Sequence, residues 1–112
     1  EVLRSQLIKG LHCVRKEEVK KIWIAYEPVW AIGTGKAATA QDAETVSAFI
    51  RKTIEAFSSG GVAERIQILY GGSVTGENIS SFLREKDVDG ALIGGASLKA
   101  EELLSIYKKA CE

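Results

Sequence analysis

One carboxylate occupies a position suited to proton transfer. Glu27 directly follows a short apolar run, Ile22 to Tyr26, and directly precedes a Gly-rich segment with Pro28 and Trp30 near its start. A carboxylate at the tip of a strand, beneath a loop that could close over it, is an arrangement suited to a covered general base. Position alone also allows a cap or a surface charge.

Two apolar residues bear on this choice. Burial of Glu27 beside Ile32 and Leu92 would disfavour its ionised form and make the carboxylate a stronger proton acceptor. Closure of the loop would remove water from the carboxylate and would likewise disfavour its ionised form. Burial and closure would thus suit Glu27 to the role of a general base, with the cap and the surface charge still open.

Two further loops each carry a Gly-Gly pair between a strand-like run and a helix, namely Gly71-Gly72 and Gly94-Gly95. One such pair alone is explained by a tight turn. Backbone NH groups without a Cβ beside them, together with a helix N-terminus, form a site suited to phosphate. The repetition favours phosphate, and the expected donors are the NH groups of Gly33, Ser73, Gly94 and Gly95.

Lys36 ends a segment that looks faintly like a nucleotide-binding loop. In the pattern Gly-x-x-x-x-Gly-Lys-Ser/Thr, the leading Gly would fall at Trp30 and the hydroxyl at Ala37, so neither position matches. Lys36 is interpreted as a solvated residue at the exit of the loop.

Three strand-like runs position these loops, at residues 22–26, 66–70 and 90–93. Each is nearly continuously apolar, which favours a parallel sheet covered on both faces. The loops after them, at residues 28–38 and then 71–75 and 94–97, should emerge on one common face, where α/β folds bind ligands.

Helices are expected between and after these strands. Thr39 and Asp42 resemble a capping box and Gly60-Gly61 supplies a stop, which predicts a helix over residues 40–58. The other helices are marked by apolar stripes: Leu3 and Leu7 within residues 1–10; Ile79, Phe82 and Leu83; and Leu103, Ile106, Tyr107 and Ala110. The alternation is typical of an α/β protein with right-handed crossovers.

Composition narrows the classes of partner. Among 112 residues, 46% hydrophobic, 15 basic and 15 acidic side chains cancel, which argues against nucleic acid and anionic membranes as partners. No apolar stretch approaches the roughly 20 residues of a membrane span. Cys13 and Cys111 lack metal-site spacing and are expected to be reduced thiols, which favours a soluble, cytoplasmic protein.

Three motifs, residues 27–36, 70–74 and 94–98, together resemble the triosephosphate isomerase family in order and spacing, and the match extends over essentially the whole chain. The resemblance implies part of a (β/α)₈ barrel, with three parallel β/α units preceded by a helix tail. Because a complete barrel takes about 250 residues, residues 1–112 would be the carboxy-terminal portion of a single, incomplete barrel domain, strands six to eight.

The resemblance also implies roles. Glu27 would move protons between adjacent carbons of dihydroxyacetone phosphate and glyceraldehyde 3-phosphate, in glycolysis and gluconeogenesis, without a metal or cofactor. Tyr70 would hold a closed lid by a hydrogen bond near its exit. The lid hinges would be Pro28, Val29 and Trp30 at the start and Lys36, Ala37 and Ala38 at the exit, with Ile32 and Leu92 as an apolar clamp and Gly33, Ser73, Gly94 and Gly95 on the phosphate.

Other groups of the family's site have no counterpart in this chain. An Asn and a Lys from the first barrel strand and a His from the fourth are not found, and His12 precedes a strand in a linker, where a surface role is expected. The full-length protein would be a homodimer, whereas this chain alone, with unpaired sheet edges, should be inactive and aggregation-prone. Two alternatives are another sugar-phosphate barrel enzyme and a non-catalytic, phosphate-binding half-barrel that docks to a partner chain.

Overall fold

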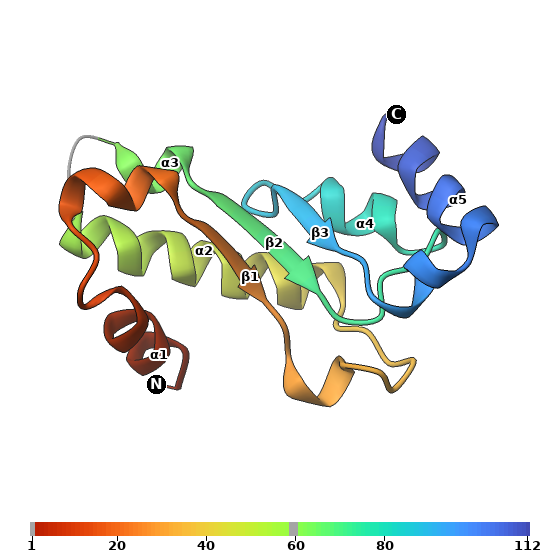
Figure 1. Cartoon of the computed structure of the whole chain (residues 1–112), viewed down its shortest axis with the longest axis horizontal. Helices are drawn as coiled ribbons and strands as arrows, with labels where there is room; N and C mark the ends of the chain where they lie inside the picture. Colours follow the sequence, from red (N-terminus) through yellow and green to blue (C-terminus); the bar gives the residue numbers. More distant parts are fainter. Residues whose placement is uncertain (1, 59–60) are drawn as a thin grey trace.

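The computed structural model describes residues 2–58 and 61–112, and it contains a parallel sheet of three strands in the order β1-β2-β3. The strands are β1 (Trp23–Tyr26), β2 (Gln67–Gly71) and β3 (Gly90–Leu92) (Figure 1). Tyr26 pairs with Tyr70, which pairs with Ala91 on its other side. The prediction of parallel β/α units is confirmed.

The helices begin and end close to the predicted positions. The longer ones are α1 (Val2–Leu11), α2 (Ala40–Phe57) and α5 (Ala100–Ala110), and the short ones are α3 (Val62–Arg65), α4 (Ile79–Leu83) and the 3₁₀ helices η1 (Lys16–Lys21), η2 (Val29–Ala31) and η3 (Gly95–Leu98).

The start of α2 is confirmed and its end is different. Thr39 and Asp42 form the capping box, because each side chain accepts a hydrogen bond from the other residue's backbone NH. The helix ends at Phe57, and Gly61 adopts a φ of 71° as the N-cap of α3 rather than as the stop of α2. Gly60 lies outside the described residues.

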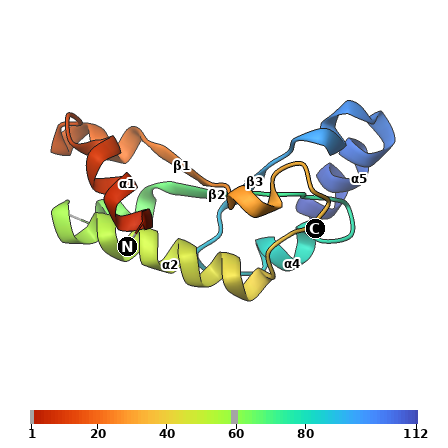
Figure 2. The ribbon, with the colours of Figure 1, turned by 90° about the horizontal axis from the view of Figure 1, so that it is seen from below.

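The core lies between the sheet and the helices on one of its faces. Alternate strand residues, among them Ile68 and Tyr70, are fully buried against α2 and α4, which lie on one side of the strands in Figure 2. Tyr26 packs against both core clusters. The Tyr70 ring stacks on Phe82 with centroids 4.3 Å apart, so the aromatic core sits directly beneath the loops that follow the strands.

The opposite face of the sheet is open, which corrects the expectation of coverage on both faces. Trp23 is 71% exposed, Ala25 is exposed and Leu69 is half-buried on this face. Apart from Gln67, the strand residues on both faces are apolar, yet the described helices cover only one face. A closed barrel would turn the open face inward, so these three strands carry an interior surface without the strands that would enclose it.

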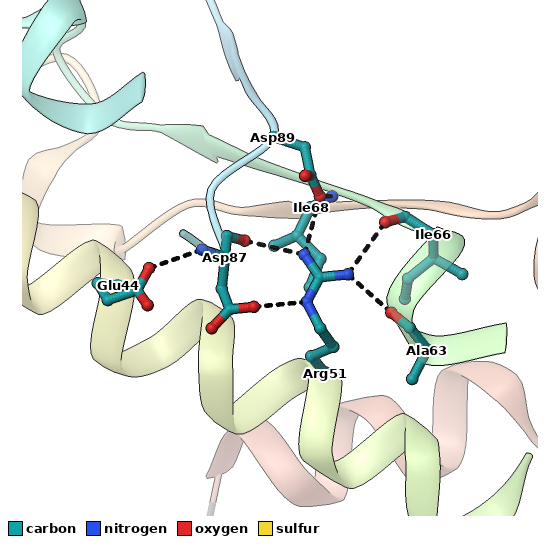
Figure 3. A network of polar contacts seen from close by, with 7 residues as sticks. All are labelled: Glu44, Arg51, Ala63, Ile66, Ile68, Asp87 and Asp89. Carbon is teal, nitrogen blue, oxygen red and sulfur yellow. Dashed lines mark hydrogen bonds and ion pairs between the residues drawn. The ribbon is translucent and has the colours of Figure 1, made fainter. Parts of the chain in front are cut away.

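The amino ends of β2 and β3 are tied to α2 by one arginine (Figure 3). Arg51 donates to Asp87 Oδ1 at 2.8 Å and to Asp89 Oδ2 at 2.9 Å. It also donates to the backbone carbonyls of Ala63 at 2.7 Å, Ile66 at 3.2 Å and Asp87 at 3.1 Å. A guanidinium can make this many bonds because its donors form a rigid fork. Helix and strands are therefore held in one register at this end.

Candidate functional site

The loops that follow the strands surround a cavity of about 550 Å³. The predicted site residues on its wall are Glu27, Ile32, Gly33, Ser73, Leu92, Gly94 and Gly95. They come from three separate β/α units, and the parallel strands bring them to one end of the sheet. The predicted common face is therefore present in the fold.

Glu27 lies across the sheet from Gly71 and Leu92, one position beyond the last paired residue of β1. A Cβ on Gly71 would lie 2.9 Å from Glu27 Cγ and 3.2 Å from Leu92 Cβ. Such distances are too short for a side chain, so the glutamate chain passes directly over the Gly71 backbone. Gly71 thus fixes where the carboxylate can lie.

The expected burial of Glu27 is not seen in this chain. Glu27 is exposed, and its apolar neighbours Ile32 and Leu92 are 51% and 41% exposed. All three border the open face of the sheet, so the side that a closed barrel would cover faces solvent. The carboxylate is positioned by the chain but is not enclosed by it.

The Gly positions leave backbone accessible at the cavity. Gly33 and Gly35 adopt φ values of 67° and 76°, which favour glycine. At Gly94 and Gly95 an added Cβ would meet nothing within 4 Å, and η3 begins at Gly95. These features fit an anion held by backbone NH groups at the first turn of a helix.

Ser73 has an unusual backbone for a residue with a side chain, with a φ of 55°. Its hydroxyl donates to the Ala31 carbonyl at 2.8 Å, and its own carbonyl accepts from Asn78 Nδ2 at 3.0 Å. A strained φ persists only where surrounding contacts determine it, and such residues cluster at functional sites. Ser73 is therefore held at the wall of the cavity from both sides.

Residues 28–38 form a loop with its own hydrogen bonds. Thr34 Oγ1 donates to the Trp30 carbonyl at 3.0 Å and accepts from Lys36 N at 3.1 Å. At the exit, the Tyr70 hydroxyl accepts from Ala38 N at 2.9 Å and donates to the Gly72 carbonyl at 2.9 Å. One buried phenol thus joins the end of this loop to the Gly-rich loop after β2.

The remaining loop residues divide into buried and exposed ones. Pro28 and Ala38 are buried and Ala37 is half-buried, so both ends of the loop are anchored. Val29 is 85% exposed, and Trp30 and Lys36 are also exposed. The exposure of Lys36 agrees with its interpretation as a solvated residue.

Sequence reasoning missed three side chains that shape these loops: Thr34, Asn78 and Glu102. Asn78 is the most recognisable, because its Oδ1 accepts from Thr75 N at 2.8 Å in a local turn that Asn favours. Glu102 accepts from Gly76 N at 2.7 Å. Its partner is distant in sequence, so no local pattern could reveal the contact.

The titratable groups outside the cavity are less informative. His12 is exposed, with Nδ1 3.6 Å from Cys13 Sγ, and Cys13 and Cys111 are both exposed free thiols. Burial raises the pKa of Tyr26, with smaller contributions from Tyr70 and Asp42.

Within residues 2–58 and 61–112, no group of three or more His, Cys, Asp or Glu side chains could hold a metal ion. No helix in the same ranges has the length and the apolar composition that a membrane span needs.

Comparison with known proteins gives the same family name for the matching family model and for the similar relatives. A family model described as triosephosphate isomerase matches residues 1–110. Proteins named triosephosphate isomerase from Borreliella burgdorferi (strain ZS7) and Geobacter metallireducens are each 52% identical over 106 residues, covering 95% of this chain and 42% of the relative. One from Dictyoglomus thermophilum is 50% identical over 108 residues, covering 96% of the chain and 43% of the relative. The chain thus spans less than half the length of these relatives.

Proposed function

Because the chain belongs to the triosephosphate isomerase family, we propose that it supplies the base and the phosphate site of an enzyme that interconverts dihydroxyacetone phosphate and glyceraldehyde 3-phosphate. In this proposal residues 1–112 form strands six to eight of one barrel domain, within glycolysis and gluconeogenesis. The supporting observation is that Glu27 and the donors Gly33, Ser73, Gly94 and Gly95 line one cavity.

Glu27 removes a proton from the carbon beside the carbonyl and returns it to the neighbouring carbon, through an enediol-type intermediate. The substrate phosphate is held by the NH groups of Gly33, Ser73 and the Gly94-Gly95 pair, at the first turn of η3. This division places the reacting carbons near the strand tips and the phosphate toward the loops. The loop at residues 28–38 acts as the lid, with its exit held by Tyr70.

In this proposal the open face of the sheet is where the rest of the catalytic site would be built. Trp23, Leu69 and Leu92 face the side that the remaining strands of a barrel would occupy. Those strands would enclose Glu27 and bring the Asn, Lys and His that polarise and hold the substrate. The full-length enzyme would be a cytoplasmic homodimer.

The test uses a completed enzyme, in which this chain follows the amino-terminal part of the Borreliella burgdorferi relative. Glu27→Gln should lower kcat by about 10²- to 10⁴-fold, the contribution of a positioned base. Glu55→Gln, at an exposed position on α2, serves as the control and should change little. Glu27→Asp moves the carboxylate back by one methylene, so an enzyme that loses little activity on this change would remove Glu27 from the role of base.

The chain alone should be inactive, and it should aggregate. Within residues 2–58 and 61–112, β1 and β3 each pair with β2 alone, which leaves an unpaired edge on each. Purified 112-residue chain should therefore elute in large species on size exclusion and show no isomerisation above background. A monomer with cooperative unfolding and measurable turnover would contradict this.

A second candidate is a non-catalytic, phosphate-binding half-barrel that docks to a partner chain. It is favoured by one observation, that Ser73, Gly94 and Gly95 line the cavity without help from another chain. Titration of the chain with inorganic phosphate, followed by NMR, distinguishes the candidates. A half-barrel binder should show shifts of the Ser73, Gly94 and Gly95 amides, and silence at those amides would count against it.

A further inference from the structure

The loop after β2 rests on the last helix through Gly76. Gly76 N donates to Glu102 Oε1 at 2.7 Å, and its carbonyl accepts from Lys109 Nζ at 2.7 Å. Gly76 is buried, and a Cβ on it would lie 2.5 Å from Ser105 Oγ. The loop backbone therefore lies directly against α5. We call these two hydrogen bonds the Gly76 clamp.

The clamp matches the geometry of α5. Glu102 and Lys109 are about two turns apart, so they project from the same face of the helix, with Ser105 between them. The carboxylate lies in the first turn and the ammonium in the last, where the helix dipole favours each. Both bonds join a charged group to a peptide group and are stronger than neutral hydrogen bonds.

The same helix also carries the other half of the proposed phosphate site. η3 starts at Gly95 and ends at Leu98, and α5 begins at Ala100. Ser73 belongs to the loop that the clamp holds, whereas Gly94 and Gly95 are joined to α5 by the chain itself. Both sets of donors are thus attached to one rigid element.

The two donor segments also border a second cavity, which lies beside α5. This cavity has a volume of about 490 Å³, and its wall includes Gly76, Gly95, Glu102 and Lys109. Thr75, Gly95 and Ala96 line this cavity and the site cavity alike. The two donor segments therefore lie between the site cavity and the cavity beside α5. The Gly76 clamp borders the second of these cavities.

We propose that Glu102 and Lys109 are positioning residues, which set the spacing of Ser73 from Gly94-Gly95 and thereby the affinity for the substrate phosphate. The inference rests on the proposed function, because it concerns the same phosphate site. Neither side chain touches substrate. Their effect is exerted through Gly76, and it should be specific to phosphorylated ligands.

The test compares two substrates in the completed enzyme. Glu102→Ala should raise KM for glyceraldehyde 3-phosphate and Ki for inorganic phosphate by about tenfold, the equivalent of one charge-assisted hydrogen bond. Its kcat/KM for unphosphorylated glyceraldehyde should stay within about twofold of the parent, because that substrate does not use the phosphate site. Lys109→Met should act in the same direction.

Matched variants separate positioning from a general loss of structure. Glu101→Ala removes the neighbouring acid from the same helix turn and should behave like the parent. Glu102→Gln keeps an acceptor for Gly76 N and should restore most of the phosphate affinity, and Lys108→Met controls for Lys109→Met. Equal losses on both substrates, or a Glu102→Gln variant as impaired as Glu102→Ala, would overturn the inference.

A parent enzyme without isomerase activity would overturn the proposed function but would still leave the inference testable. Inorganic phosphate titration and amide hydrogen exchange at Ser73 need no turnover. Weaker phosphate binding or faster exchange in Glu102→Ala than in Glu101→Ala supports the clamp. Equal values in both variants overturn it.

Discussion

The two ends of the sheet are built in opposite ways. At the amino ends of β2 and β3, Arg51 is 14% exposed and is paired with Asp87, which is 15% exposed, and with backbone carbonyls. At the carboxyl ends, Ile32 and Leu92 are exposed and Gly backbone borders a cavity. Polar groups whose hydrogen bonds are all made within the protein have none left for a ligand, whereas backbone NH groups at a cavity are accessible to one. The first end therefore carries contacts that stabilise the fold, and the second carries the accessible backbone that the proposed phosphate site requires.

The difference extends to backbone strain. The loop end contains Ser73 in a left-handed conformation and Gly33 and Gly35 with positive φ. The conformation of Ser73, which carries a Cβ, costs free energy that other contacts must offset, whereas glycine adopts a positive φ readily. The Arg51 network can do so without interfering with the site, because it lies at the opposite end of the strands. Substitutions at the two ends should therefore separate unfolding free energy from turnover.

The largest expected effect on stability is at Arg51. Arg51→Met in the completed enzyme should lower the free energy of unfolding by about 3–5 kcal/mol, because it leaves Asp87 and Asp89 partly buried without their cation. Arg51→Lys should recover only part of this, since an ammonium lacks the planar fork. Urea unfolding gives the values, with exposed Lys52→Met as the control.

Turnover per folded molecule should be nearly unchanged in Arg51→Met below its unfolding midpoint. A variant that unfolds normally but loses its activity would break the separation of the two ends, because it would place Arg51 in the function of the loops.

At the other end, Gly71→Ala should act mainly on turnover. The new methyl group would displace Glu27 Cγ, and a shift of about 1 Å in a catalytic group costs about 10²-fold in rate. Unfolding free energy should fall by about 1–3 kcal/mol from overpacking. Gly90→Ala is the matched control, because its methyl would meet only the terminal Cδ2 of Leu69, a flexible end. Equal rates for the two variants would mean that Gly71 does not position the carboxylate.

Local patterns in the sequence were enough for much of this structure. The capping box of α2 involves residues three apart, and the strand runs are marked by their own composition. The loops around Gly71 and Gly94 were predictable because each comes directly after a predicted strand in the sequence. Once the strands are parallel, their carboxyl ends must meet, so the grouping of Glu27 with these loops was predictable.

Interactions between distant segments were not predictable. Arg51 lies 36 residues from Asp87 and 38 from Asp89, and nothing near it distinguishes it from a surface arginine. Glu102 lies 26 residues from Gly76. The exposure of Glu27 was also mispredicted, because burial depends on strands that would close the open face of the sheet.

Tyr70 lies in the aromatic core near the carboxyl end of β2, and Tyr70→Phe should have an intermediate effect. The loss of its hydroxyl leaves Ala38 N and the Gly72 carbonyl, both on buried residues, without this partner, at a cost of about 1–3 kcal/mol in unfolding free energy. Hydrogen exchange at Ala38 should become faster. Tyr107→Phe, 66% exposed on α5, should show neither change. Unaltered exchange at Ala38 would show that the phenol does not hold the loop exit.

The smallest effect is expected at the half-buried Glu18, whose ion pairs with exposed cations contrast with the Arg51 network at the same end. Its carboxylate accepts from Lys21 Nζ and Arg15 Nη2, both at 2.9 Å, and the hydrogen bond with Lys21 is the main cause that holds the pKa of Glu18 below its usual value.

A lowered folded-state pKa stabilises the protein above the unfolded value, and this stabilisation is lost as pH falls through the folded pKa. Glu18→Gln should therefore lower Tm slightly near neutral pH and leave it unchanged in strong acid, with salt reducing the difference because the partner cations are exposed. Thermal scans of both proteins across that range provide the measurement. A Tm difference that persisted in acid would assign the effect to packing of η1 rather than to charge.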